Sequence, residues 1–197
     1  MPELPVLSVG TDAIPHPAAA PAPEREAERG RLPHVVAWNL TQRCNLACAH
    51  CYIAAGDWHS RADDLTTAEC RRIADEILEL NPGAMFVLSG GEPLLRDDLE
   101  AIAAHASDAG ATVVVGTNGT LLTDRRLDSL AAAGVKGFAL SIDSLDPAYH
   151  DRFRHGAGAL EETLAAVDRV RDHGIDFLVQ TTVTRGNRTE LTDIPAF

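Results

Sequence analysis

The sequence predicts an α/β protein whose parallel strands form an open or partial barrel, and three observations support this fold class. Strand-like apolar segments alternate with helix-like segments throughout residues 33–197. Gly110, Gly134 and Gly174 each fall between a helix and the next strand, and glycine readily adopts the left-handed conformation that ends a helix. Repeated strand–helix units have right-handed crossovers, which make the strands parallel. A closed eight-stranded barrel takes about 250 residues, so the units visible in this 197-residue chain give only part of one.

Five strands are expected because each segment is short and rich in apolar or β-branched residues. Segment 84–88 is apolar throughout, which is typical of a strand that a parallel sheet buries on both faces. In chain order, the expected strands are 35–41, 84–88, 112–115, 138–142 and 176–183.

Four long helices are expected between the strands. The first begins at a capping box formed by Thr66 and Glu69, and Asn81-Pro-Gly83 ends it. Its apolar face is expected to contain Cys70, Ile73, Ile77 and Leu80, with Cys70 as a core residue. The other helices are expected at about 96–109, from the N-cap Thr123 onward, and at about 160–173.

Three cysteines follow the first strand with the spacing C-x3-C-x2-C: Cys44, Cys48 and Cys51. Three thiols in so short a loop indicate a metal centre rather than a disulfide. Thiolates favour iron–sulfur clusters, zinc or copper(I), and a structural zinc ion normally takes four protein ligands. A cubane cluster held by three cysteines leaves one iron open to a further ligand. If such a cluster is present, residues later in the chain should bind that ligand.

Polar or glycine-containing motifs also lie at the C-terminal ends of the other four strands, where α/β barrels place their active sites. They are Ser89-Gly-Gly-Glu-Pro93, Gly116-Thr-Asn-Gly-Thr120, Ser141-Ile-Asp143 and Gln180-Thr-Thr182. Each motif alone is compatible with an ordinary turn. Together with the cysteines, they predict a ligand that lies across the mouth of the barrel.

The cysteine loop, Gly90-Gly-Glu-Pro93 and Ser141-Ile-Asp143, in this strand order, resemble the radical S-adenosylmethionine (SAM) superfamily over about residues 34–194. The resemblance implies a partial (β/α)6 barrel with a [4Fe–4S] cluster and SAM as cofactors. It also implies the reaction, in which reductive cleavage of SAM yields methionine and a 5′-deoxyadenosyl radical that abstracts hydrogen from a substrate.

The resemblance assigns roles around the cluster. Cys44, Cys48 and Cys51 are expected to ligate three irons, and SAM to chelate the fourth. His50 stands where the family usually places an aromatic residue beside the adenine. Tyr52 is expected either to pack over the cluster or to enter the core.

Further roles concern SAM itself. Gly90 and Gly91 are expected to let the backbone approach the SAM amino group, and Glu92 to accept a hydrogen bond from it. The alternative for Glu92 is a solvated acid in a turn. The residues expected to contact the ribose or the carboxylate of SAM are Asn118, Ser141, Asp143 and Arg154, with Thr182 as a weaker candidate. Their alternatives are structural hydrogen bonds at strand ends, a solvated charge for Arg154 and a core position for Thr182.

Residues 37–52 resemble one branch of the family, which includes haem-biosynthesis enzymes and SPASM-type peptide maturases. This implies a tetrapyrrole substrate, as in making the haem of denitrification, or a peptide substrate. It also implies an electron donor such as flavodoxin or ferredoxin. Both kinds of enzyme usually carry a cysteine-rich C-terminal extension, whereas no cysteine follows Cys70 here. One alternative is therefore an inactive truncated fragment, which predicts exposed apolar edges on the fifth strand. A second alternative is a structural metal-binding module.

The composition argues against several other classes. A net charge of −12 disfavours a nucleic acid or anionic membrane partner. No apolar run reaches the roughly 18 residues of a membrane span, and the N-terminus lacks the layout of a secretory signal. Clustered cysteines suit a reducing compartment, so we expect a cytoplasmic location. Seven of the eleven prolines lie in the first 33 positions, so residues 1–32 are expected to form a flexible Pro/Ala-rich tail before the folded domain, 33–197.

Overall fold

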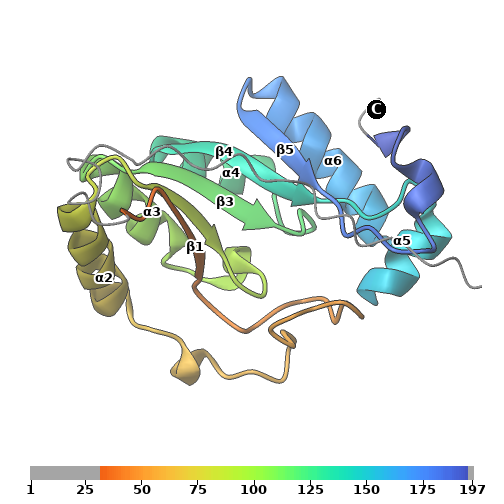
Figure 1. Cartoon of the computed structure of the whole chain (residues 1–197), viewed down its shortest axis with the longest axis horizontal. Coiled ribbons are helices and arrows are strands. Elements are labelled where there is room, and N and C mark those ends of the chain that lie inside the picture. Colours follow the sequence, from red (N-terminus) through yellow and green to blue (C-terminus); the bar gives the residue numbers. More distant parts are fainter. Residues whose placement is uncertain (1–31, 195–197) are drawn as a thin grey trace, which may run out of the picture. The chain divides into compact units, whose positions relative to one another are not determined.

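The computed structural model describes residues 32–194 and contains one sheet of five parallel strands in sequential order (Figure 1). Each neighbouring pair of strands is parallel, as the repeated strand–helix unit predicts. The strands are β1 (Val35–Asn39), β2 (Met85–Ser89), β3 (Thr112–Thr117), β4 (Val135–Ser141) and β5 (Asp176–Gln180). This singly wound sheet confirms the predicted partial α/β barrel. The predicted tail lies outside the described residues, apart from Leu32.

The four predicted helices are present. They are α2 (Thr67–Leu80), α3 (Leu99–Asp108), α4 (Asp124–Ala132) and α6 (Ala159–Asp172). Thr66 and Glu69 form the predicted capping box, and the Thr123 side chain accepts a hydrogen bond from the Arg126 N–H at the start of α4. Helices α3, α4 and α6 pack on β3, β4 and β5, and α2 packs on α3. No helix in residues 32–194 is long and apolar enough to cross a membrane.

Several short helices were not predicted. The helix α5 (Pro147–Arg154) lies between β4 and α6, and its eight residues are mostly polar, so it carries little apolar periodicity. Three single-turn 3₁₀ helices are also found among the described residues: η1 (Arg61–Asp63), η2 (Pro93–Leu95) and η3 (Arg188–Glu190). Helix α3 begins at Leu99 rather than near 96, because η2 and the N-cap Asp98 precede it.

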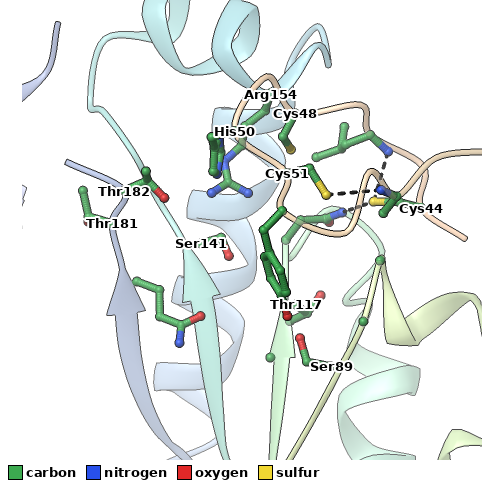
Figure 2. A pocket seen from close by; sticks show the side chains of 18 residues that line it. Cys44, Cys48, His50, Cys51, Ser89, Thr117, Ser141, Arg154, Thr181 and Thr182 are labelled. Carbon is green, nitrogen blue, oxygen red and sulfur yellow. Dashed lines mark hydrogen bonds between the residues drawn. The ribbon is translucent and has the colours of Figure 1, made fainter. Parts of the chain in front are cut away.

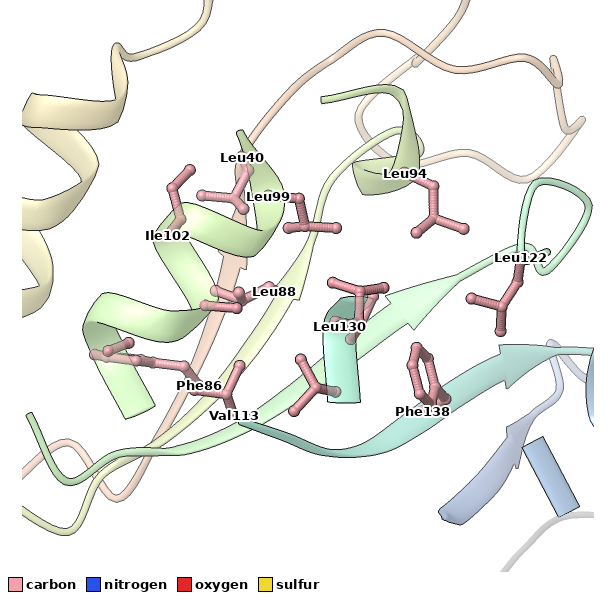
Figure 3. Packing of buried hydrophobic residues seen from close by; sticks show 14 of the residues in the cluster. Leu40, Phe86, Leu88, Leu94, Leu99, Ile102, Val113, Leu122, Leu130 and Phe138 are labelled. Carbon is pink, nitrogen blue, oxygen red and sulfur yellow. The ribbon is translucent and has the colours of Figure 1, made fainter. Parts of the chain in front are cut away.

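The hydrophobic core lies between the helices and one face of the sheet (Figure 3). The strands contribute fully buried side chains such as Phe86, Leu88 and Phe138, and the helices contribute others such as Leu99 and Leu130. Burial of each such side chain contributes roughly 1.5–3 kcal/mol.

The prediction that β2 is buried on both faces is wrong, because its burial alternates. Phe86 and Leu88 face the helices, whereas Met85 and Val87 on the other face are half-buried. That second face is the concave side of an open barrel, and no helix layer covers it among the described residues.

Two further expectations about helices have different outcomes. Gly110, Gly134 and Gly174 have φ values of +103°, +87° and +65°, which confirms their role in ending helices. Cys70 is fully buried, as predicted, but Leu80 is 63% exposed. The inward face of α2 continues through Leu78 instead, because four-residue steps from Cys70 return to the same side of the helix.

Strand β5 forms an exposed edge of the sheet. Phe177 and Leu178 on this strand are 39% and 51% exposed. The strand ends at Gln180 rather than near 183, because the Thr182 N–H donates to Asp143 and the chain turns away from the sheet. The exposed apolar edge is the feature that the fragment alternative predicts.

Candidate functional site

A cavity of about 540 Å³ lies where the C-terminal ends of β2, β3, β4 and β5 meet the cysteine loop (Figure 2). All three loop cysteines line it, together with polar and glycine residues from each of these strand ends. Every site residue predicted from the sequence borders this cavity except Glu92 and Asp143. The structure therefore brings the separate motifs together at one place.

The cysteine loop is held by its own backbone. The Cys44 N–H donates to the Gly56 carbonyl at 3.1 Å, and the Cys51 N–H donates to the Cys48 carbonyl at 3.1 Å. Two sulfurs accept backbone hydrogen bonds: Cys44 Sγ from Leu46 N–H at 3.4 Å, and Cys51 Sγ from Ala55 N–H at 3.2 Å. The Leu46 N–H acts to lower the pKa of Cys44, because a donor favours the charged thiolate form.

The surroundings of the cysteines are partly apolar. Cys44 packs in a small buried cluster with Leu46, Ala55 and Ala159, and Cys48 and Cys51 pack against it. Burial raises the pKa of Cys44 to about 11, and it also raises the pKa of Cys48. These thiolates therefore form readily only when a cation bound beside them compensates for the lost hydration.

The arrangement of the three sulfurs discriminates between metal centres. Within residues 32–194, no three Cys, His, Asp or Glu side chains converge closely enough to hold a single metal ion. The three cysteines nevertheless line one cavity. A cubane cluster presents a separate iron to each thiolate and does not require the sulfurs to meet at one point. The donor set therefore fits an iron–sulfur cluster better than a structural zinc ion.

Gly90 and Gly91 bring the β2 loop into direct contact with the cysteine loop. A Cβ atom at Gly90 would lie 2.4 Å from the Thr41 carbonyl oxygen, and one at Gly91 would lie 2.2 Å from the Arg43 carbonyl oxygen. The Gly91 N–H donates to Thr41 O at 2.7 Å. These glycines are thus required by packing within the protein, a reason that the sequence analysis did not identify, and they also border the cavity.

Glu92 lies behind the cavity wall and is fully buried. Its carboxylate accepts hydrogen bonds from Thr117 Oγ1 at 2.8 Å, from Asn118 N–H at 2.9 Å and from Leu94 N–H at 3.0 Å. Burial raises its pKa, and these three donors act in the opposite direction. Burial contradicts the alternative of a solvated acid, and Glu92 is absent from the residues that line the cavity. Its contact with the SAM amino group remains a prediction.

Asp143 is also fully buried, and it forms an ion pair with Arg154. Its Oδ2 accepts from Arg154 Nε at 2.9 Å and lies 2.8 Å from a second guanidinium nitrogen, Nη2. Its Oδ1 accepts from Thr182 N–H at 2.8 Å. These protein partners agree with the alternative of structural hydrogen bonds at a strand end, and a contact of Asp143 with a ribose or carboxylate remains a prediction. Arg154 is 6% exposed, so the alternative of a solvated charge is also wrong.

His50 and Tyr52 have different environments. The His50 ring stacks on Phe153, with centroids 4.4 Å apart and planes 10° apart. Burial lowers the pKa of His50, which favours the neutral imidazole. Tyr52 is 83% exposed, so the alternative that it enters the core is wrong. Its hydroxyl exchanges hydrogen bonds with the Asn39 side chain at 3.0 and 3.1 Å, which holds the ring beside the cavity.

Asn118 and Ser141 border the cavity from neighbouring strands. The Asn118 amide donates to Asn45 Oδ1 at 2.9 Å, and its nitrogen lies 4.0 Å from Cys44 Sγ. Thr182 borders the cavity as well. Contacts of these residues with SAM remain predictions.

Two buried residues near Asp143 were missed by the sequence analysis. His150 Nδ1 accepts from the Asp143 N–H at 3.3 Å, and the Asn187 amide donates to the Asp143 carbonyl oxygen at 2.6 Å. Both side chains are fully buried. No local sequence pattern marks either residue, because their partners lie 7 and 44 positions away.

Comparisons with known proteins agree with this site. The chain is 42% identical over 160 residues to the AdoMet-dependent heme synthase of Methanosarcina barkeri (strain Fusaro / DSM 804), which covers 81% of this chain and 45% of the relative. It is 39% identical over 174 residues to the pre-heme d1 synthase of Dinoroseobacter shibae (strain DSM 16493 / NCIMB 14021 / DFL 12), covering 88% of this chain and 42% of the relative. The chain thus spans less than half the length of these relatives.

A solved structure shares the fold. The crystal structure of Streptococcus suis SuiB superposes with a TM-score of 0.71 at 14% sequence identity, over 84% of this chain and 36% of that one. At this identity, the likeness concerns the fold alone. The sequence profile described as the Radical SAM superfamily matches residues 38–191. The chain therefore belongs to the radical SAM superfamily of enzymes, whose cofactors are a [4Fe–4S] cluster and S-adenosylmethionine.

Proposed function

We propose that the cavity is the SAM-cleaving site of a radical SAM enzyme that acts on a tetrapyrrole in the biosynthesis of haem or a modified haem. The observation that carries the first part is the convergence of three cysteine thiols, two glycines and one guanidinium on a single cavity. The names of the two most similar relatives reported above support the second part.

The residues of this chain have distinct tasks in this proposal. Cys44, Cys48 and Cys51 would hold the cluster, in a partly apolar surrounding that limits access of water. Arg154 would bind a ligand carboxylate, and His50 would lie beside the adenine. When bound, the cluster and SAM supply a 5′-deoxyadenosyl radical that abstracts a hydrogen atom from the substrate. An electron donor such as flavodoxin or ferredoxin and a reducing, cytoplasmic compartment complete the proposal.

The first experiment tests the cofactors. Anaerobic reconstitution should load about four irons per chain, and addition of dithionite and SAM should release 5′-deoxyadenosine. Cys48→Ala should abolish both results, whereas Cys70→Ala should keep its iron, because Cys70 lies in the core away from the cavity. Tight binding of zinc without any iron–sulfur cluster in the wild type would contradict the proposal and favour a structural metal-binding module.

The second experiment tests the substrate class. Titration of the reconstituted protein with an iron porphyrin that carries propionate side chains should shift the porphyrin absorbance bands and give a saturable isotherm. A peptide-modifying maturase, the second prediction from the sequence, should leave these bands unchanged. Cluster loading and SAM cleavage without porphyrin binding would therefore retain the SAM-cleaving site and overturn the tetrapyrrole assignment.

A further inference from the structure

We propose that Asp143 is a positioning residue that fixes Arg154 as the carboxylate anchor of the cavity and does not itself contact the ligand. This inference rests on the proposed SAM-cleaving site and changes the role that the Ser141-Ile-Asp143 motif was expected to have.

Protein groups supply the hydrogen-bond partners of both Asp143 carboxylate oxygens. Oδ2 binds two nitrogens of Arg154, at 2.9 and 2.8 Å, and Oδ1 accepts from the Thr182 N–H at 2.8 Å. Asp143 is fully buried and is absent from the residues that line the cavity. Arg154 and His50 border the cavity next to this carboxylate, and His50 Nε2 lies 3.8 Å from Oδ2.

The same contacts orient Arg154. Its Nε and Nη2 are held by Asp143, whereas Nη1 has no protein hydrogen bond in the described part of the chain. Figure 2 shows the guanidinium projecting between His50 and Ser141, on the side of the cavity that also carries Cys48. A guanidinium fixed along one edge presents its remaining N–H groups in a set direction, which suits a carboxylate ligand.

The distribution of charge supports an anionic ligand group. Among the described residues that line the cavity, Arg154 carries the only permanent charge. The two nearby acids, Glu92 and Asp143, are both fully buried behind the wall. In a chain of net charge −12, the cavity thus exposes guanidinium N–H donors, whose charge is paired with Asp143 behind the wall, and no carboxylate.

Residues behind Asp143 make its position rigid. Asn187 donates from its amide to the Asp143 carbonyl oxygen at 2.6 Å and to the Thr182 carbonyl oxygen at 2.9 Å. His150 accepts from the Asp143 N–H. The helix that carries Arg154 is joined to the cysteine loop by a hydrogen bond from Ala49 N–H to Phe153 O at 2.9 Å. Asp143 therefore links the segment after β5 to the helix beside the cysteines.

The test compares two probes that differ only in the carboxylate, SAM and decarboxylated SAM, by equilibrium dialysis with the anaerobically reconstituted protein. Asp143→Asn and Arg154→Gln should each weaken SAM binding about 10-fold or more, as expected for loss of a charge-assisted contact. Binding of decarboxylated SAM should change less than about twofold. The double variant should lose no more SAM affinity than Arg154→Gln alone, because Asp143 acts through Arg154.

Controls separate the possible outcomes. Arg152→Gln alters an exposed arginine on the same helix and should leave both affinities unchanged. If Asp143→Asn does not fold, as judged by circular dichroism, Asp143→Glu keeps the charge but displaces the carboxylate and should also weaken SAM selectively. Equal losses for both probes would show that Asp143 does not act through the carboxylate contact and would overturn the inference. Failure of the wild type to bind SAM would instead contradict the proposed function.

Discussion

Replacing Glu92 with glutamine tests whether this acid holds two motifs together or contacts a ligand. The side chain keeps its size, but an NH₂ group replaces one carboxylate oxygen. If it replaces Oε2, the Asn118 N–H loses its acceptor; if it replaces Oε1, the Leu94 N–H and Thr117 hydroxyl lose theirs. The first arrangement costs less, and one buried N–H without an acceptor costs about 1–3 kcal/mol.

The expected result is a decrease of about 1–3 kcal/mol in the free energy of unfolding, measured by urea denaturation with circular dichroism. Glu92→Ala should cost more, about 3–5 kcal/mol, because it removes every acceptor and leaves a cavity. Glu79→Gln, an exposed acid on α2, is the matched control and should change stability by less than about 0.5 kcal/mol.

One result would refute this reasoning. If Glu92→Gln leaves the unfolding free energy unchanged but weakens SAM binding, the carboxylate must contact the ligand, as the sequence resemblance implied. If stability falls and SAM affinity falls only in proportion to the loss of folded protein, the structural role is confirmed.

Two other predictions concern stability. Gly91→Ala should destabilise the protein by about 1–3 kcal/mol in urea denaturation, because the new Cβ would lie 2.2 Å from the Arg43 carbonyl oxygen. The control Gly83→Ala, whose new Cβ has its nearest neighbour at 3.8 Å, should change stability little. Equal effects of the two substitutions would contradict the packing argument. Burial lowers the pKa of His150 from 6.5 to about 4, so between these pH values the unfolded chain binds a proton that the folded chain does not. The wild type should therefore lose stability relative to His150→Gln as pH falls from about 6.5 to about 4, by up to about 1.4 kcal/mol per pH unit. If the unfolding free energies of the two proteins, measured by denaturation, change in parallel with pH, His150 is not held neutral.

The strand–helix repeat was predictable because its signals are local. The capping box at Thr66 and Glu69 involves residues three positions apart, and Gly110 ends a helix through its own backbone conformation. The short helix α5 was missed for the same reason, since its stability comes from packing rather than from an apolar periodicity of its own. The two faces of β2 also differ only because helices cover one of them, which no local pattern records.

The sequence by itself determined the fold class and the three cysteines, because both depend on spacing along a short stretch of chain. Only the tertiary structure decided the surroundings of the two acids in the expected site. Glu92 and Asp143 stand in polar motifs that favour ligand contacts, yet both are buried. Their partners lie 26 positions away at Asn118 and 39 positions away at Thr182. Distant segments supply the hydrogen-bond donors of both buried carboxylates, and only the folded chain brings those donors together.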